Sequence, residues 1–338
     1  MPKKGRATSV DIAHLAGVSQ ATVSRVLRGS PLVSAETRRR IEALVREHNY
    51  KVDKHASSLR TQRASTLALL LFEDPSPDES HINPFFLSML GSITRACARH
   101  GQDLLVSFQQ FSDDWHADYE DSKKADGLIL LGYGDYLAYE EKLRKLVEQG
   151  THFVRWGAVL PDQPGVSIGC DNLDGGRKVG AHLAARGHRR VAFLGDDSSH
   201  CPEFRARRNG CEQALQAAGA AIVAQFDAIS GEESGAAAAR ALLDSGIGFD
   251  AVFAASDLIA IGALGVFTAA GLRVPEDVAL VGFDDIPLAR FTRPALTTVF
   301  QDTQRAGELL VDSLMRLVRG ESVESRMVPA QLVVRQSA

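Results

Sequence analysis

One helical face near the N-terminus carries side chains suited to reading DNA. Ala21, Ser24, Arg25 and Arg28 are spaced so that an α-helix places them on one side. An arginine fork can pair with the acceptor edge of guanine, and the neighbouring Gln20 can pair with adenine. These residue types at this spacing indicate a helix that presents its polar face to the major groove.

Local capping signals divide the same segment into short helices. Thr8 can cap a first helix with Asp11 as its reciprocal partner, and Gly17 fits the left-handed position that ends the helix. Ser19 then caps a second helix of about eight residues. Two short helices joined by a glycine-containing turn form a helix-turn-helix, and a third helix is predicted after the cap Ser34.

Short hydroxyl side chains stand at the starts of these helices, where they are suited to bind phosphate oxygens. Together with the polar face, they define the set of residues that we assign to DNA in this segment: Thr8, Ser19, Gln20, Ala21, Thr22, Ser24, Arg25, Arg28 and Ser34.

Charge is distributed unevenly along the 338 residues. Residues 1–63 contain 13 Lys and Arg against 5 Asp and Glu, whereas residues 64–338 contain 25 against 37. The formal net charge of −4 therefore hides a basic segment of +8 on an acidic body of −12. Basic terminal segments often bind nucleic acid, and the capped, periodic pattern distinguishes this one from a disordered tail.

The body, from about Thr66 onward, has the pattern of a doubly wound α/β fold. Short continuous apolar runs alternate with longer helical stretches, which indicates parallel sheets covered on both faces. The runs are LALLLF, DLLVSF, GLILL, HFVRW, RVAFLG, AVFAA and VALVGF. More than 270 residues follow this pattern, which is too long for one sheet, so we expect two similar lobes.

Several classes of protein are disfavoured by the sequence. It contains no GxGxxG after a strand and no GxxxxGK[ST], so no nucleotide-binding motif supports an enzyme. The four cysteines lack a CxxC pair and the histidines lack ligand spacing, so we expect neither a metal nor a cofactor. No apolar run approaches about 20 residues, and no signal peptide is recognisable, so a cytoplasmic protein is expected.

The N-terminal motifs resemble the DNA-binding headpiece of the lactose-repressor/galactose-repressor (LacI/GalR) family. The matching segments are AGVSQATVSRVL, the VSAETRRRI start of the third helix and the closing NY. The resemblance implies that the pair Gln20 and Ala21 sets operator choice and that Arg25 contacts a base.

The next segment, KVDKHASSLRTQRAS, resembles the hinge of that family. The resemblance implies a helix that forms in the minor groove on DNA, with Ala56 and Leu59 as the inserting apolar pair. Val52 stands where the family often has proline, which implies a softer start of this helix. An ordinary linker whose leucine packs on the body is the alternative interpretation.

The body resembles the family's effector domain, which is similar to periplasmic sugar-binding proteins. NPFFLSMLGSI, ADGLILLG, DNLDGG, GHRRVAFLGD, RARRNGCEQAL, SDLIAIGAL and VPEDVALVGFDDIPLARFTRPALTTV match it in order. The resemblance implies ligand in a cleft between two lobes, with crossings near Cys170, Val299 and Val328. We therefore expect a headpiece over 1–50, a hinge over 51–63 and an effector domain over 64–338. Its near lobe would comprise 64–170 and 299–327, and its far lobe 171–298 and 328–338.

Pocket residues follow from the same resemblance. Arg207 matches a ligand-contacting arginine, whose fork can hold adjacent hydroxyls or a carboxylate, and Asp284 matches an acidic ligand contact. Ser256 and Asp257 stand where the family usually has Asn-Asp. The remaining candidates are Phe86, Tyr133, Arg155 and Trp156.

Other roles are open for several of these residues. Arg207 belongs to a group of three arginines and can be a solvated charge, whereas Asp284 can cap the loop after its strand. Trp156 and at least one of Phe85 and Phe86 can be ordinary core residues. Arg155 stands where several family members carry an acidic ligand contact, so it would invert the local charge.

The combined expectation is a dimeric, ligand-responsive transcription regulator, a repressor of carbohydrate uptake or catabolism genes. Its partners would be double-stranded operator DNA, a small effector such as a sugar, and a second copy of the chain, with no membrane. VPAQLVVRQSA contains no apolar heptad of the kind that tetramerises the lactose repressor, which favours a dimer. The alternatives are a periplasmic-type solute-binding protein, a purine- or nucleoside-responsive regulator of the same fold, and a sugar-modifying enzyme fused to a helical module.

Overall fold

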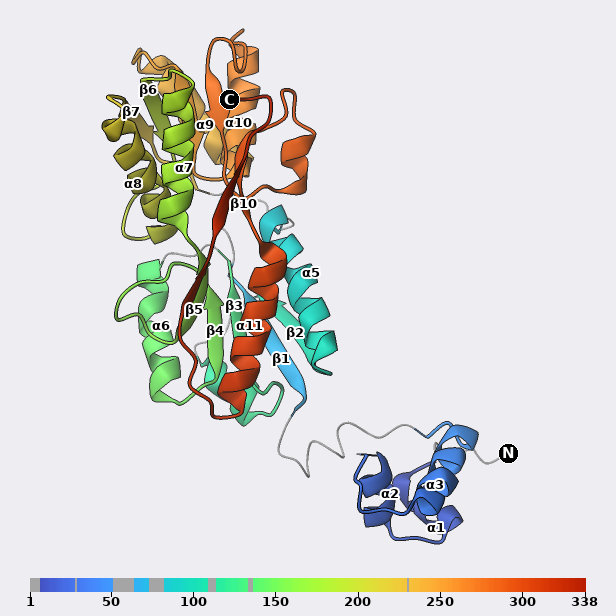
Figure 1. Cartoon of the computed structure of the whole chain (residues 1–338). Coiled ribbons are helices and arrows are strands. Elements are labelled where there is room, and N and C mark those ends of the chain that lie inside the picture. The colour runs from blue at the N-terminus through green and yellow to red at the C-terminus, as the bar shows by residue number, and fades with distance from the viewer. Residues whose placement is uncertain are drawn as a thin grey trace. The chain divides into compact units, whose positions relative to one another are not determined.

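The computed structural model describes residues 7–27, 29–50, 64–72, 82–108, 114–132, 136–229 and 231–338. The chain divides into two compact units, Met1–Ala64 and Ser65–Ala338. Figure 1 shows helices alone in the first unit and two α/β lobes in the second. No helix within the described ranges is long and apolar enough to cross a membrane.

The first unit is a bundle of three short helices, α1 (Ser9–Ala16), α2 (Gln20–Leu27) and α3 (Ala35–Glu47). Each helix contributes one fully buried aliphatic side chain, Ile12, Val23 and Ile41, to a common core. Leu44 and Val45 pack against this core from α3. The apolar spacing seen in the sequence therefore places the inner faces of the helices as expected, and leaves their polar faces to solvent.

One lobe of the second unit contains a six-stranded sheet in the order β11-β5-β4-β3-β1-β2. All its strand pairs are parallel, as the continuous apolar runs predicted. The strands are β1 (Thr66–Leu71), β2 (Asp103–Phe108), β3 (Leu128–Leu131), β4 (Phe153–Trp156), β5 (Val166–Cys170) and β11 (Arg326–Val328). The helices of this lobe are α5 (Pro84–Arg99), α6 (Tyr136–Glu148), α11 (Thr303–Val318) and the π-helix η1 (Ala117–Asp121).

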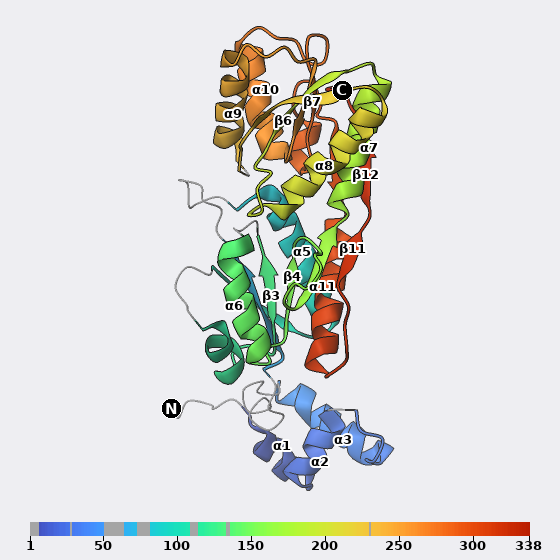
Figure 2. The same cartoon turned by 90° about the vertical axis from the view of Figure 1, so that its left-hand side faces the viewer.

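Helices cover both faces of the six-stranded sheet, as β1 illustrates. Leu67 and Leu69 belong to the cluster that contains the inner residues of α5 and α11, whereas Ala68 and Leu70 pack with Leu143 of α6. Successive side chains of a strand point to opposite faces, so the run of apolar residues is buried on both sides. Figure 2 shows α6 and the α5–α11 pair on opposite sides of this sheet.

The other lobe contains a four-stranded parallel sheet in the order β7-β6-β8-β9. Its strands are β6 (Arg190–Leu194), β7 (Ala221–Phe226), β8 (Ala251–Ala254) and β9 (Ala279–Val281). Its helices are α7 (Asn172–Ala185), α8 (Pro202–Ala217), α9 (Glu232–Asp244), α10 (Asp257–Ala269) and the short 3-10 helix η2 (Pro287–Arg290). The pairs α7–α8 and α9–α10 lie on opposite faces (Figure 2).

Glycines allow α7 and α8 to pack backbone against backbone. A Cβ on Gly176 would lie 1.9 Å from the carbonyl oxygen of Arg207, and one on Gly210 would lie 1.9 Å from that of Leu173. Both positions therefore exclude any side chain. This close approach fixes the position of α8, on which several candidate site residues lie.

Within the described residues, the chain passes between the two lobes three times. It crosses after β5, again along β10 (Thr298–Gln301), and finally between β11 and β12 (Ala330–Val333). β10 and β12 form a separate antiparallel pair in which Val299 is opposite Leu332. Figure 1 shows β10 running from one lobe toward the other.

Candidate DNA-binding face and ligand cleft

The first helix of the headpiece begins at the predicted capping box. The Thr8 backbone N–H donates to Asp11 Oδ2 at 2.8 Å, and the Asp11 N–H donates to Thr8 Oγ1 at 3.3 Å. The hydrogen bonds with Thr8 hold the pKa of the Asp11 carboxyl below its usual value. Gly17 ends the helix with φ of 61°, in the left-handed region that favours glycine.

The second helix presents the predicted polar face. Val23 and Val26 are buried, whereas Gln20, Ala21 and Arg25 are exposed. Ser24 is half-buried and Arg28 lies outside the described residues. The exposed set therefore retains the two side chains, Gln20 and Arg25, that can pair with base edges.

The hydroxyl groups assigned to DNA are engaged locally. Ser19 Oγ accepts a hydrogen bond from the Thr22 N–H at 3.2 Å and lies 2.9 Å from Thr22 Oγ1. Ser34 Oγ accepts from the Thr37 N–H at 3.3 Å at the start of α3. Thr8, Ser19 and Ser34 are thus at helix starts, where hydroxyls and backbone N–H groups together suit phosphate. The hinge residues Ala56 and Leu59 lie outside the described residues.

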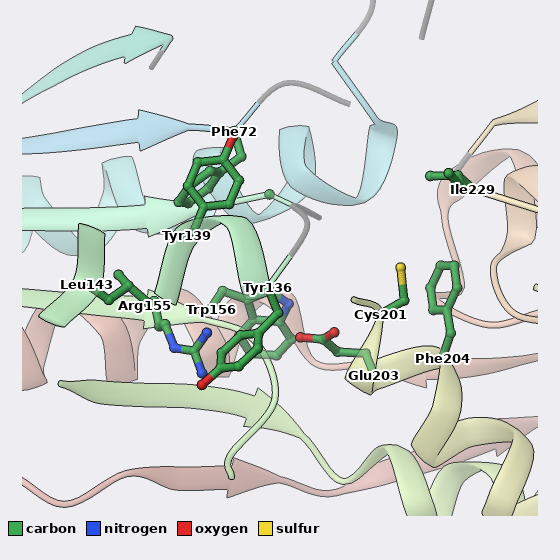
Figure 3. Close-up of a pocket in the computed structure, with 11 residues that line it drawn as sticks. Phe72, Tyr136, Tyr139, Leu143, Arg155, Trp156, Cys201, Glu203, Phe204 and Ile229 are labelled. Atoms are coloured by element: carbon green, nitrogen blue, oxygen red, sulfur yellow. The ribbon is translucent and has the colours of Figure 1, made fainter. Parts of the chain in front are cut away.

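A pocket lies between the two lobes of the second unit, with about 640 Å³ of empty space when the part open to solvent is counted. Most of its lining is aromatic or aliphatic, with one cation and one anion among the described lining residues. Figure 3 shows its walls, formed by Phe72, Gly132, Tyr136, Tyr139, Leu143, Arg155, Trp156, Cys201, Glu203, Phe204 and Ile229.

Arg155, at the end of β4, is held rigidly in the pocket wall. Its Nε donates to Ser167 Oγ at 2.6 Å, and its Nη2 donates to Gln163 Oε1 at 2.6 Å and to the Ala158 carbonyl at 3.0 Å. The guanidinium lies over the ring of Tyr136, 5.0 Å from the centroid. Burial lowers the pKa of Arg155, and the nearby Glu203 carboxylate offsets part of that effect.

Hydrogen bonds across the pocket join the two lobes. The Ala158 N–H, just after β4, donates to Glu203 Oε1 at 2.7 Å, and Glu203 lies in the first turn of α8 in the other lobe. The Tyr136 N–H at the start of α6 donates to the His200 carbonyl at 3.1 Å. The lobes are therefore in direct polar contact beside the pocket.

Arg207 is almost completely buried, at 1% exposure, behind this wall. Its Nε donates to Asn172 Oδ1 at 2.8 Å, and its Nη1 donates to the Ala255 carbonyl. The guanidinium lies 3.8 Å from the ring centroid of Phe283 and 5.2 Å from that of Phe204, which lines the pocket. The interpretation of Arg207 as a solvated charge is therefore wrong.

Ser256, Asp257 and Asp284 belong to the same buried polar region. Ser256 Oγ caps α10 by accepting from the Ile259 N–H at 3.3 Å. Asp257 accepts from the Ile286 N–H at 2.8 Å and from the Thr298 hydroxyl. Burial, followed by the charge of Asp284, raises the pKa of Asp257 well above its usual value.

Of the eight predicted ligand residues, Arg155 and Trp156 line the pocket. Four others form the buried polar region behind it: Arg207, Ser256, Asp257 and Asp284. Phe86 is a core residue whose ring centroid lies 5.3 Å from that of Phe85, and Tyr133 lies outside the described residues. Within the described chain, no group of three or more His, Cys, Asp or Glu could hold a metal ion.

Several lining residues were not predicted from the sequence, although signals for some of them were present. Glu203 and Phe204 precede Arg207 by four and three positions, so a helix places all three on one side. Tyr136 and Tyr139 have the same spacing of three on α6. Phe72, which lies 4.4 Å from the ring centroid of Tyr139, follows β1 without a local signal.

A helix-turn-helix headpiece combined with a two-lobed body of parallel sheets and an inter-lobe pocket defines a DNA-binding regulator of the periplasmic-binding-protein-like type. Residues 9–53 match the family described as bacterial regulatory proteins, lacI family, and residues 181–338 match the periplasmic binding protein-like domain. The HTH-type transcriptional regulator CelR of Thermobifida fusca is 33% identical over 348 residues, covering 100% of both chains.

Solved structures agree with this assignment. The CelR–cellobiose complex matches 98% of this chain and 100% of its own, with TM-score 0.71 and 32% identity. The lac repressor dimer bound to operator and the anti-inducer ONPF matches 98% of this chain and 99% of its own, with TM-score 0.83 and 27% identity. The chain belongs to the lacI family of bacterial regulatory proteins and is a DNA-binding transcription regulator.

Proposed function

We propose that this protein is a homodimeric repressor of carbohydrate uptake or catabolism genes, whose operator affinity is controlled by a sugar or sugar derivative in the inter-lobe pocket. The observation that carries the proposal is the pocket itself, in which aromatic walls surround one cation and one anion among the described lining residues. Aromatic rings offer flat apolar surfaces to the C–H faces of a sugar, and a few polar groups orient its hydroxyls. The solved cellobiose complex of CelR supports this ligand class.

Control of DNA binding would follow from ligand contacts with both lobes. A sugar that touches Trp156 on one side and Phe204 on the other stabilises one arrangement of the lobes. This changes operator affinity only if the ligand binds the DNA-bound and free states with different affinity. We propose the hinge segment, with Ala56 and Leu59, as the element that transmits the difference to DNA.

The predicted ligand residues take different parts in this proposal. Arg155 and Trp156 contact the ligand directly from the pocket wall. Arg207 and Asp284 hold α8 and the loop after β9 in place behind Phe204, and Ser256 and Asp257 anchor the start of α10. We therefore propose fewer direct contacts between protein and ligand than the sequence predicted.

A second copy of the chain would complete the DNA-binding unit. Two headpieces bind a pseudo-palindromic operator because the two-fold axis of a dimer matches two half-sites. Leu288 on η2 and Phe291 just after it are 49% and 74% exposed, and these two neighbouring apolar side chains support an interface there.

Fluorescence anisotropy with the purified protein and its own upstream DNA tests the proposal. Sugars, sugar acids and nucleosides are added separately, at two salt concentrations. We expect tight, salt-sensitive binding that one carbohydrate shifts, and the sign of the shift separates an inducer from a corepressor. A response only to a purine or nucleoside would replace the sugar with the alternative effector, and DNA binding that no compound changes would contradict the pocket assignment.

A further inference from the structure

The charges of the described residues that line the pocket are balanced. Its described lining residues include one cation, Arg155, and one anion, Glu203, and the others are uncharged. A charged ligand in a largely apolar pocket needs an excess of the opposite charge, because burial strips away its water. Neither sign is in excess here.

Most of the hydrogen-bonding capacity of Arg155 is used within the protein. Three of its N–H bonds, on Nε and Nη2, donate to Ser167, Gln163 and the Ala158 carbonyl. Its Nη1 faces the same small space as the Glu203 carboxylate. Both groups lie beside Gly157: a Cβ added to this glycine would lie 3.2 Å from Glu203 Oε1 and 3.7 Å from Arg155 Nη1.

Glu203 reaches this position from the other lobe. It lies on α8, and its Oε1 accepts the hydrogen bond from the Ala158 N–H at 2.7 Å. Glu203 lines the pocket, and Figure 3 shows its carboxylate directed toward Trp156 and Tyr136. A carboxylate oxygen only accepts hydrogen bonds, so it suits a sugar hydroxyl and repels a ligand carboxylate.

We infer that Glu203 is a specificity-determining residue that makes the pocket select uncharged sugars over sugar acids. The inference rests on the sugar-binding function proposed above and specifies its ligand class. Glu203 compensates the Arg155 guanidinium and places a carboxylate beside the ligand. Glu203 does both only when the two lobes are in contact. The selection of uncharged sugars is therefore coupled to the arrangement in which the lobes touch.

Glu203→Gln isolates the charge. The glutamine amide oxygen can still accept from the Ala158 N–H, so the inter-lobe hydrogen bond is retained while the negative charge is lost. Glu203→Ala removes both the negative charge and the inter-lobe hydrogen bond. Glu212→Gln is the matched control, because Glu212 lies on the same helix, pairs with Arg208 and is absent from the described pocket lining.

Isothermal titration calorimetry at pH 7 compares glucose with glucuronate and cellobiose with cellobionate, using the full chain. The wild type and Glu212→Gln are expected to bind a neutral sugar and to reject its acid. In Glu203→Gln the ratio of acid to neutral-sugar affinity should rise about tenfold or more, the size of one charge-assisted hydrogen bond. Glu203→Ala should weaken the neutral sugar further than Glu203→Gln, because it also loses the inter-lobe bond.

The outcomes separate the two proposals. A wild type that binds an acid as tightly as its neutral partner overturns the selectivity, and so does an unchanged ratio in Glu203→Gln, while the sugar-binding function stands. If none of the four compounds binds and the wider sugar panel also leaves operator affinity unchanged, the proposed function fails and the selectivity fails with it.

Discussion

Arg207 and Asp284 form an ion pair inside the four-stranded lobe, with Nη1 3.6 Å from Oδ1 and side-chain exposures of 1% and 2%. Asp284 also accepts from the Gln301 amide at 2.6 Å, and Gln301 lies on β10, one of the crossings between the lobes. The pair therefore ties α8, which carries Glu203 and Phe204 into the pocket, to an inter-lobe strand.

Arg207→Ala should abolish the ligand response and also destabilise the body. Removing one partner of a buried ion pair leaves the other charge unpaired, which costs about 3–5 kcal/mol. Urea unfolding and effector titration measure the two losses. The residues assigned to DNA lie in the headpiece and do not include Arg207. Operator binding by the protein that remains folded should therefore persist. An unchanged effector response would remove Arg207 from the ligand-response machinery.

Asp257→Asn should flatten the pH dependence of stability. Because the folded-state pKa of Asp257 is raised above 3.8, the folded state binds its proton more tightly than the unfolded state. Stability from this group is therefore present at low pH and decreases as the pH rises from about 3.8 through the raised pKa. The asparagine amide oxygen can still accept from the Ile286 N–H, and the side chain no longer titrates. Urea midpoints between pH 4 and 8 compare the variant with the wild type, and parallel curves would contradict the expectation.

Arg25→Ala should remove operator discrimination without affecting the effector. Loss of one base-pairing arginine costs about 1–3 kcal/mol at the correct site. Anisotropy with operator and with scrambled DNA measures this, and scrambled DNA should be affected much less. Calorimetry with the sugar serves as the control, since equal loss of sugar affinity would argue against separate DNA and ligand modules.

Phe291→Ser combined with Leu288→Ser should shift the protein toward monomer. Burying one large apolar side chain contributes about 1.5–3 kcal/mol, so two exposed ones on η2 and just after it can decide a dimer equilibrium. Sedimentation velocity measures the change, with Val147→Ser, an exposed residue of α6, as the control. A double variant that remains dimeric would place the interface on another face.

Gly157→Ala should weaken sugar binding modestly while leaving operator affinity without ligand unchanged. The added methyl group would stand 3.2 Å from Glu203 Oε1, so the carboxylate must shift and lengthen its bond to Ala158. Calorimetry should show a loss of less than about tenfold, because only the end of a flexible side chain has to move. A complete loss of folding would show that the glycine has another role.

The sequence by itself determined the features whose causes are local. Thr8 and Asp11 stand three positions apart, Gly17 supplies the left-handed turn, and Ser34 caps α3, so neighbouring residues alone define the headpiece helices. Likewise, six of the seven apolar runs identified the bodies of buried strands, because burial on both faces requires a continuous apolar segment. The seventh run, DLLVSF, forms the edge strand β2, whose side chains are exposed or half-buried.

Only the tertiary structure decided which polar groups meet. Arg155 and Ser167 are neighbours because β4 and β5 pair. Glu203 and Ala158 are 45 positions apart in the sequence, and they meet because the two lobes are in contact. Arg207 is buried rather than solvated because glycines bring α7 against α8 and aromatic rings cover its guanidinium. Such contacts depend on packing between distant elements, which no local spacing of residues records.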